Sequence, residues 1–215
     1  LMLLARQWRW IRAEGPTLCV ASVDHGLRPE AAEEAAAVGR LAINLGLAHE
    51  GLQLGMPLTM RGLQEAAREA RYAVLARHAQ AIGATGIVTA HTLDDQAETV
   101  LFRLMRGSGI SGLAGMATER PLEGVALLRP LLGVRKAELI AVCDRAGVGF
   151  VEDPSNRDTR FARARLRLLM PLLEREGLGA ERLARLAERA ARADAALEAM
   201  VSHAASELLD VTSPG

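Results

Sequence analysis

The sequence predicts an α/β protein with a parallel sheet flanked by helices, followed by a helical segment. Short apolar runs at residues 17–23 and 86–90 alternate with longer helical patterns, an alternation that is typical of parallel α/β sheets. Beyond residue 155 the sequence becomes helical throughout and rich in arginine. We therefore predict an α/β domain over residues 1–155 and a helical, arginine-rich segment over residues 156–215.

Each element follows from its own pattern. Apolar residues three to four apart predict helices over residues 1–12, 30–45, 63–82, 93–105 and 136–146, and again from Phe161 onward. Short apolar runs bounded by turn residues predict strands over residues 17–23, 48–54, 86–90 and 148–152, with a loop and a short strand within 121–133. Thr92 is the expected N-cap of the helix over 93–105, because Asp94 and Asp95 would lie in its first turn, where acids suit the helix dipole.

Composition excludes several classes of protein. The 215 residues hold two cysteines, Cys19 and Cys143, far apart in sequence, so a disulfide scaffold, a C-x-x-C redox pair and a four-cysteine zinc site are excluded. No apolar run approaches the roughly 20 residues of a membrane span. We therefore expect a cytoplasmic protein that does not enter a membrane.

The formal net charge of zero conceals an uneven distribution. Residues 1–156 carry 16 basic and 17 acidic groups, residues 157–192 carry 10 arginines and 5 acids, and residues 193–215 carry four acids and no base. The three segments have net charges of −1, +5 and −4. A basic stretch in a neutral protein predicts a local contact with a polyanion.

Polar residues follow two of the predicted strands. Asp24, His25 and Gly26 end the first strand, while Ala90 and His91 end the strand over 86–90. Parallel sheets bind ligands at the carboxyl ends of their strands, and a glycine allows the backbone to approach a ligand closely. These residues predict a nucleotide pocket, although each histidine taken alone also fits a structural role.

Three carboxylates gather near one turn of the helix over 93–105. Asp94 lies four residues, and Asp95 three residues, before Glu98. Such a cluster could hold Mg²⁺, orient an amine substrate or act as a base. The alternative is an acidic turn that only complements the helix dipole.

Two further segments are rich in arginine. Residues 64–72 place Arg68 and Tyr72 on one helical face with Arg71 beside it, a pattern that also fits a solvated face. Residues 157–167 hold five arginines and one acid, which either contact phosphates or form a solvated charge run. Salt-sensitive RNA binding would belong to this second segment.

The blocks VDHGLR, QEAAREARY, TAHTLDDQAETVLFRLMRGSG, GLAGM, RPLL, EDPSN and FARARLR occur in this order. Together they resemble the bacterial tRNA(Ile)-lysidine synthetases, which belong to the N-type ATP pyrophosphatase (PP-loop) group. The resemblance covers about residues 17–175 and implies a Rossmann-like sheet of the adenine nucleotide alpha hydrolase type. It also implies a ligase that uses ATP and Mg²⁺ to adenylate the wobble cytidine of a tRNA(Ile) with a CAU anticodon. Free lysine then displaces AMP to give lysidine.

The resemblance also implies roles for individual residues. Asp95 and Glu98 are expected to recognise the lysine ammonium group, and Arg71 and Arg163 are expected to contact phosphates or the activated intermediate. The nucleotide pocket is then formed by Asp24, His25, Gly26, Ala90 and His91. The tRNA contacts are assigned to Arg106, Arg163, Arg165 and Arg167. The metal ligands stay unassigned and a homodimer stays open.

One family feature is missing from these residues. The phosphate-binding sequence S-G-G-x-D-S occurs nowhere in the chain, and backbone amides of such a loop bind pyrophosphate. We therefore expect an N-terminally truncated domain without its first strand, inactive as a 215-residue polypeptide. Two alternatives remain: a PP-loop tRNA thiolase, which usually requires more closely spaced cysteines, and a non-catalytic nucleotide-binding module.

Overall fold

A computed structural model describes residues 1–12, 14–24, 30–54, 63–150 and 162–208. The chain forms two compact units, which are described here one at a time. Unit 1 comprises Leu1–Ala90 and Glu119–Arg129, and unit 2 comprises His91–Thr118 and Pro130–Gly215. The domain boundary expected near residue 155 lies outside the described residues and stays a prediction.

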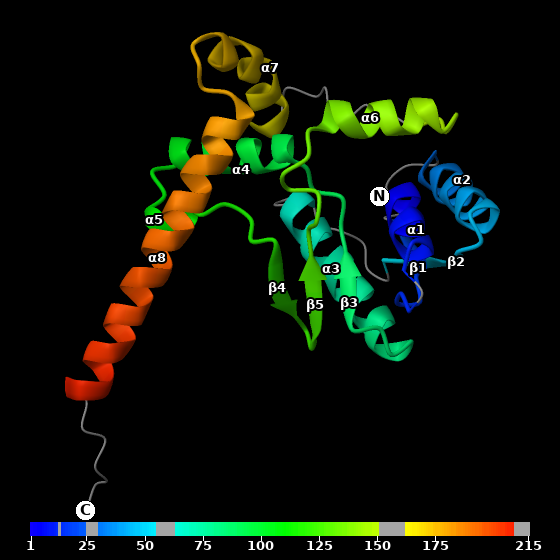
Figure 1. Ribbon diagram of the computed structural model, residues 1–215, viewed down its shortest axis with the longest axis horizontal. Helices are drawn as coiled ribbons and strands as arrows, with labels where there is room; N and C mark the ends of the chain where they lie inside the picture. The colour runs from blue at the N-terminus through cyan, green and yellow to red at the C-terminus, as the bar shows by residue number, and fades with distance from the viewer. Residues whose placement is uncertain (13, 25–29, 55–62, 151–161, 209–215) are drawn as a thin grey trace, which may run out of the picture. The chain divides into compact units, whose positions relative to one another are not determined.

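Unit 1 contains the strands of the α/β fold (Figure 1). Its elements, in chain order, are α1 (Met2–Trp10), β1 (Cys19–Asp24), α2 (Glu30–Asn44), β2 (Ala48–Gln53), α3 (Leu63–Ala81), β3 (Gly86–Val88), β4 (Glu119–Leu122) and β5 (Val125–Leu128). Every helix and strand expected before residue 90 is therefore present. The ends differ from the expected ones by a few residues at most.

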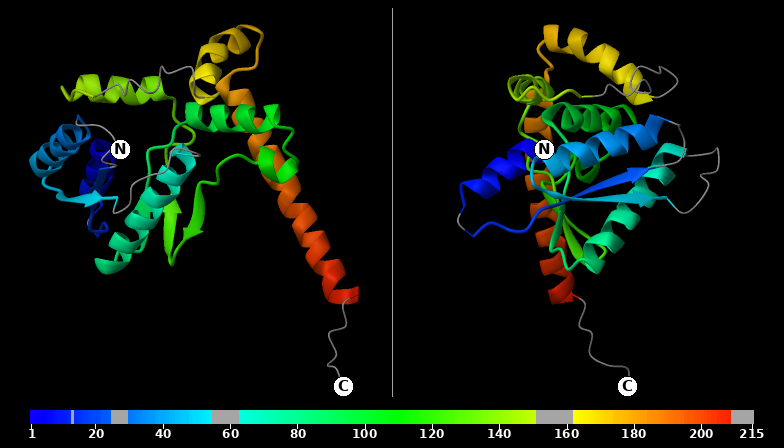
Figure 2. Two further views of the ribbon diagram at one scale, coloured as in Figure 1. Left: turned by 180° about the vertical axis from the view of Figure 1, so that it is seen from behind. Right: turned by 90° about the vertical axis from the view of Figure 1, so that its right-hand side faces the viewer.

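Parallel pairing dominates the two sheets of unit 1. Strand β1 pairs with β2 in parallel, with Cys19 opposite Ala48 and Asp24 opposite Gln53. Strand β3 pairs with β5 in parallel, with Gly86 opposite Ala126. Helices α2 and α3 both contact the β1–β2 pair, and they lie on its opposite faces (Figure 2). Because α3 also contacts β3 and β5, one helix covers strands of both sheets.

The hairpin formed by β4 and β5 was only half expected, because the sequence predicts one short strand in this region. Strand β4 pairs antiparallel with β5, and Glu123 and Gly124 between them both have positive φ, 44° and 83°. Two consecutive residues with positive φ form the tight turn that suits a hairpin. Asn-Gly or Asp-Gly is the usual sequence signal for this turn, so the Glu-Gly pair found here does not indicate it. Pro121 is compatible with β4 only because β4 is an edge strand.

Unit 2 is built from helices in its described part. They are α4 (Leu93–Met105), α5 (Ile110–Leu113), α6 (Lys136–Arg145), α7 (Ala162–Arg175) and α8 (Ala180–Leu208). Helix α4 contacts α5, α7 and α8, and α5 also contacts α8. The core of the unit consists of Leu93, Ala97, Val100, Leu101, Leu166, Ala180, Leu183 and Ala187.

The strand expected over residues 148–152 is wrong for its described part, because residues 148–150 form no strand. The backbone N–H groups of Gly147 and Val148 donate to the carbonyls of Asp144 and Cys143. Gly147 has a φ of 62°, which is typical of a helix C-terminal cap. In this cap the backbone N–H of Val148 is engaged with the helix, so it is not available for hydrogen bonds to a neighbouring strand. Residues 151 and 152 lie outside the described part.

None of the helices in the described part of the chain is both long and apolar enough to cross a membrane.

Candidate functional site

The N-terminus of α4 is fixed by a capping box. The Thr92 hydroxyl accepts a hydrogen bond from the backbone N–H of Asp95 at 3.3 Å. In return, the Asp95 Oδ2 atom accepts hydrogen bonds from the Thr92 backbone N–H and from the Thr92 hydroxyl, both at 2.8 Å. The expected N-cap role of Thr92 is confirmed. Asp95 thus has a structural function at Oδ2, and these contacts do not involve its Oδ1 atom.

Asp94 has a different structural function. Its Oδ2 atom accepts a hydrogen bond from the backbone N–H of Lys136 at 2.7 Å. Lys136 is the first residue of α6, where N–H groups lack partners within the helix and a negative charge is favourable. Asp94 therefore joins the start of α4 to the start of α6.

Glu98 is the buried carboxylate of this region. Glu98 is 5% exposed. Its Oε1 atom accepts a hydrogen bond from Nε of Arg167 at 2.6 Å, and the two side chains form an ion pair between α4 and α7. The other oxygen, Oε2, is buried and has no hydrogen-bond partner among the described residues. An unsatisfied buried oxygen is costly, so one further hydrogen-bond donor at Oε2 would be favourable.

Burial sets the titration behaviour of Glu98. It raises the pKa of this carboxyl above its ordinary value, and the nearby charge of Asp95 acts in the same direction. The hydrogen bond from Arg167, together with the charges of Arg167 and Arg163, offsets part of the effect. The structure therefore brings Asp95, Glu98, Arg163 and Arg167 into one electrostatic cluster.

A cavity of about 560 Å³ lies between α4 and α7. Two of the predicted tRNA contacts, Arg106 and Arg165, line it together with Phe102 and Leu169. The Arg106 guanidinium lies 4.3 Å from the centre of the Phe102 ring, in cation–π geometry. Arginines beside an aromatic and aliphatic wall can contact both the phosphates and the bases of a nucleic acid.

Most of the other predicted site residues belong to unit 1. Asp24 is the last residue of β1, Ala90 follows β3 and is exposed, and Arg71 lies on α3 with an exposed side chain. His25 and Gly26 lie outside the described residues, and His91 is the first residue of unit 2. Asp24 therefore lies at the carboxyl end of β1, and Ala90 lies two residues after the carboxyl end of β3.

Tyr72 lies at the centre of a cluster of arginines in unit 1. The guanidinium groups of Arg68 and Arg120 lie 5.5 and 5.7 Å from the centre of its ring, and Arg129 interacts electrostatically with it. Arg129 is 3% exposed, and burial lowers its pKa below the ordinary value. The shared face of Arg68 and Tyr72 is confirmed, whereas the burial of Arg129 had no signal beyond its place in the block RPLL.

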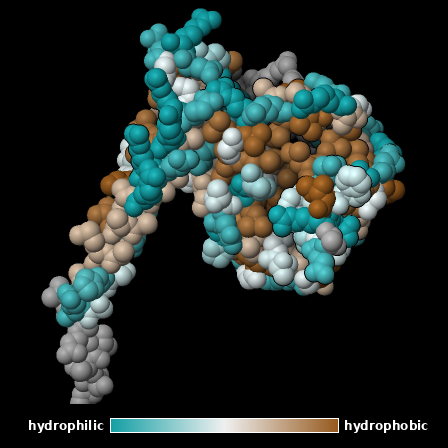
Figure 3. Space-filling model, viewed as in Figure 1, coloured by the Kyte–Doolittle hydropathy of each residue, from teal (hydrophilic) through white to brown (hydrophobic). Residues whose placement is uncertain are grey.

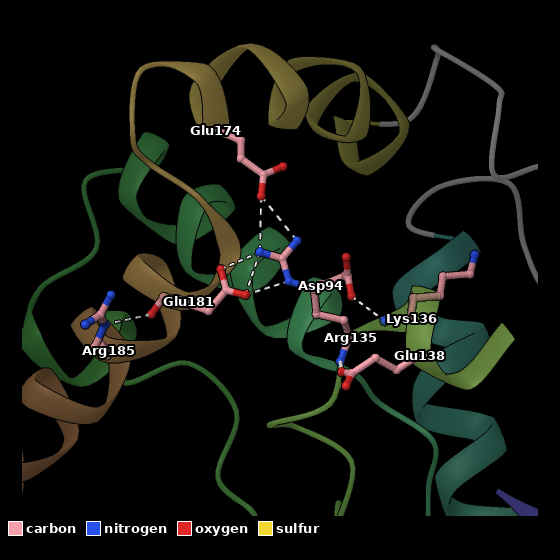
Figure 4. A network of polar contacts seen from close by, with 7 residues as sticks. All are labelled: Asp94, Arg135, Lys136, Glu138, Glu174, Glu181 and Arg185. Carbon is pink, nitrogen blue, oxygen red and sulfur yellow. Dashed lines mark hydrogen bonds and ion pairs between the residues drawn. The ribbon is translucent and has the colours of Figure 1, made fainter. Parts of the chain in front are cut away.

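Arg135 connects three segments of unit 2, as Figure 4 shows. It donates to Glu181 at 2.5 Å from both Nε and Nη2, and to Glu174 at 3.1 Å from Nη2. Arg135 is the N-cap of α6, Glu174 lies on α7 and Glu181 on α8. These contacts raise the pKa of Arg135 and lower that of Glu181. Sequence reasoning missed this network because its members lie about 40 residues apart.

Gln96 and Arg103 fix the loop after α4, and neither was a predicted site residue. The Gln96 side chain donates to the Met116 carbonyl at 3.0 Å and accepts from the Met116 N–H at 2.8 Å. Arg103 donates to the carbonyls of Gly112 and Gly115. A Cβ atom at Gly115 would lie 2.8 Å from Gln96 Oε1, which explains the second glycine of the block GLAGM.

No group of three or more His, Cys, Asp or Glu residues suited to a metal ion occurs among the residues with described positions. The donor set seen here therefore does not by itself fit a metal site, and no ligand is assigned.

Comparison with known proteins places this arrangement in a family. The family model described as "PP-loop domain" matches residues 1–173. Because the match covers most of the chain, the chain belongs to the PP-loop domain family.

Individual relatives narrow the comparison. The chain is 58% identical over 204 residues to a tRNA(Ile)-lysidine synthase of Rhodopseudomonas palustris, which covers 95% of this chain and 59% of that protein. It is 54% identical over 204 residues to the enzyme of that name from Bradyrhizobium diazoefficiens, with coverage of 95% and 56%. The chain therefore spans a little over half the length of these relatives.

A solved structure shows the same fold. The U34-tRNA thiolase NcsA from Methanococcus maripaludis, determined with its [4Fe-4S] cluster, superposes with a TM-score of 0.72 at 18% identity. The superposition covers 87% of this chain and 67% of that chain. At this level of identity the likeness establishes the fold alone.

Proposed function

We propose that the protein containing this chain is a ligase that joins lysine to C2 of the wobble cytidine in tRNA(Ile) with a CAU anticodon. The observation that carries the proposal is the 58% identity to a tRNA(Ile)-lysidine synthase over 95% of the chain. The buried Glu98 carboxylate between α4 and α7 supplies a matching chemical feature.

The reaction has two steps. The C2 carbonyl oxygen of cytosine attacks the α-phosphorus of ATP and expels pyrophosphate, since the carbonyl carbon is a poor electrophile until its oxygen becomes a leaving group. An amine nitrogen of lysine then forms a bond to C2, the bond between C2 and oxygen breaks, AMP leaves, and the nitrogen loses a proton. Phosphate charge develops in both steps and calls for arginine donors, a role that we assign to Arg71 and Arg163.

Lysine recognition is assigned to Glu98 and Asp95. A lysine ammonium would supply the donor that Glu98 Oε2 lacks among the described residues, and the capping box leaves Oδ1 of Asp95 available. Arg167 pairs with Glu98, so in this proposal it positions the carboxylate in addition to contacting the RNA. The nucleotide contacts fall to Asp24, His25, Gly26, Ala90 and His91, and the RNA contacts to Arg106, Arg163 and Arg165.

Mg²⁺ would accompany the nucleotide, because this ion is commonly bound through phosphates and only one or two carboxylates. No step of the proposal depends on a protein ligand for it.

The decisive variant is Glu98→Ala in protein expressed from the whole open reading frame. We expect the KM for lysine to rise at least tenfold, a loss of about 1.4 kcal/mol, while ATP binding measured by calorimetry changes little. Asp94→Ala is the matched control, since it removes a carboxylate from the same turn that is engaged with α6, and its lysine KM should stay unchanged. An unaltered lysine KM in Glu98→Ala would contradict the assignment.

The second candidate is a PP-loop tRNA thiolase, a class of enzyme whose fold this chain shares. Cys19 lies on β1 and Cys143 on α6, and two cysteines are fewer than an iron–sulfur cluster usually requires. Incorporation of sulfur into tRNA without a requirement for lysine would favour this candidate. Nucleotide binding without pyrophosphate release in the presence of tRNA and lysine would instead favour a non-catalytic module.

A further inference from the structure

The first third of α8 has a fixed orientation in unit 2. Leu183 is fully buried, Ala187 is 1% exposed and Ala190 is 9% exposed, and α8 packs on α4 and α5. Residues three, four and seven apart share one side of a helix, so these three residues define the inner side. The opposite side of this part of α8 therefore faces outward.

The outer side carries a row of arginines. Arg182, Arg185, Arg189 and Arg192 are all exposed and recur every three or four residues. At 1.5 Å per residue the row extends for about 15 Å along the helix. A groove of about 370 Å³ lies among Arg182, Arg185, Leu186 and Arg189. None of these residues belongs to the site proposed above.

The neighbouring acids neutralise this row only in part, since the charge of Arg185 is a minor contribution to the lowered pKa of Glu181. Glu181 pairs with Arg135, whereas Arg185 donates only to the backbone carbonyl of Glu181, at 3.4 Å (Figure 4). Glu188 lies within one turn of Arg185 and Arg192, yet it forms no ion pair with an arginine of the described chain. A helix face that serves only for solubility usually pairs such charges at spacings of three or four residues.

Charge along α8 is polarised. Residues 182–192 hold four arginines and one acid, whereas residues 193–208 hold three acids and no arginine or lysine. In Figure 3 the first part of α8 shows a hydrophilic surface and the next part a more hydrophobic one. A polyanion would thus be attracted to residues 182–192 of the helix and repelled farther along it.

We infer that the arginine row of α8 binds the sugar–phosphate backbone of an RNA stem. The inference rests on the proposed function for its choice of RNA, and it adds a contact surface outside the catalytic region. Guanidinium groups spaced along a straight helix match consecutive phosphates, while Leu186 offers an apolar contact for a ribose. Because the contacts go to the backbone, they position the RNA without reading its sequence.

The test compares two double variants with equal loss of charge. Arg185→Gln with Arg189→Gln removes the centre of the row, while Arg40→Gln with Arg145→Gln removes exposed arginines from α2 and α6. The Kd for an RNA stem-loop of the CAU anticodon arm is measured at several salt concentrations in protein expressed from the whole open reading frame. Each lost phosphate contact should reduce the slope of log K against log salt by about 0.7 to 0.9.

We expect the α8 variant to bind the stem-loop at least fivefold more weakly at low salt, with a slope smaller by about 1.4 to 1.8. A stem-loop of scrambled sequence should lose affinity equally, and Arg185→Lys with Arg189→Lys should recover most of the slope. Equal Kd and slope in the α8 and control variants would overturn the inference. So would an unchanged RNA affinity together with lost binding of a polyglutamate peptide, which would assign the row to an acidic protein.

Failure of the proposed function can be recognised separately. If the enzyme forms no lysidine but the α8 variant still loses salt-dependent RNA affinity, the surface stands and the ligase proposal fails. If lysidine forms and the α8 variant binds RNA as the control does, the ligase proposal stands and the surface fails. If the enzyme is active, the α8 double variant should have a higher KM for tRNA than the wild type and the same KM for lysine.

Discussion

Glu98 shows how one side chain can serve both stability and binding. Its carboxylate is almost completely buried on α4 and has one ion-pair partner, Arg167. Burial of a charge with a single partner costs stability unless further hydrogen bonds compensate. The raised pKa of Glu98 reflects this cost, and a bound ammonium group would reduce it.

The pH dependence of stability follows from the direction of that shift. Since the pKa of Glu98 is raised in the folded state, its contribution to stability is fully present below the unfolded pKa, which is about 4.3 for glutamate, and is lost as pH rises through the folded value. Glu98→Gln removes this titration but keeps a side-chain oxygen that can accept from Arg167. We expect the stability of Glu98→Gln relative to wild type to increase as pH rises from 4 to 7, measured by urea unfolding.

Glu98→Asp retains a titrating carboxyl and is the control. A constant difference between wild type and Glu98→Gln across this range would mean that the carboxyl titrates normally in the folded protein.

At the scale of elements, contacts between helix ends hold unit 2 together. The Asp94 carboxylate accepts a hydrogen bond from the first backbone N–H of α6. Arg135 joins the start of α6 to α7 and α8 through ion pairs. The Arg135 contacts involve half-exposed side chains, so each is worth at most about 1 kcal/mol. The Asp94 contact satisfies a backbone N–H that has no partner within its helix.

Asp94→Ala should therefore destabilise the protein by about 1 kcal/mol, the usual effect of losing a helix N-terminal cap. Asp94→Asn keeps an acceptor oxygen at this position and should restore most of the lost stability. Thermal unfolding of the two variants measures the difference. Equal destabilisation by both substitutions would indicate that the negative charge, and not the hydrogen bond, stabilises α6.

At the scale of the whole molecule, the described residues contain two separate cores. Leu127 is fully buried in the core of unit 1, with Tyr72 and Ala76, whereas Leu183 is fully buried in the core of unit 2. The chain passes between the units at residues 90, 118 and 129. Separate cores predict separate local opening of the two units.

Leu183→Ala tests this prediction. The variant should lose about 2–5 kcal/mol of stability, and hydrogen exchange should speed up more for amides of α4 and α8 than for amides of β3 and β5. Leu127→Ala should show the opposite preference. Uniform loss of protection throughout the chain in both variants would show that the two units unfold as one.

Local patterns predicted most of the helices and strands. The Thr92 cap, the helix after it and the strands ending near Asp24 and Val88 all depend on residues close in sequence, so periodicity and capping rules suffice. The glutamate in the β4–β5 turn and the absence of a strand over residues 148–150 escaped these rules. Glutamate is not a usual signal for a turn with positive φ, and a short apolar run does not show whether a partner strand is present.

The sequence by itself determined the α/β class, the parallel strands and the concentration of acids at 94–98 and of arginines at 157–192. Only the tertiary structure distributed the roles among the acids. It assigned Asp94 to α6 and Glu98 to Arg167, and it directed the α8 arginines outward by burying Leu183 and Ala187. The physical reason is that burial and pairing depend on residues distant in sequence, which meet only when the chain is folded.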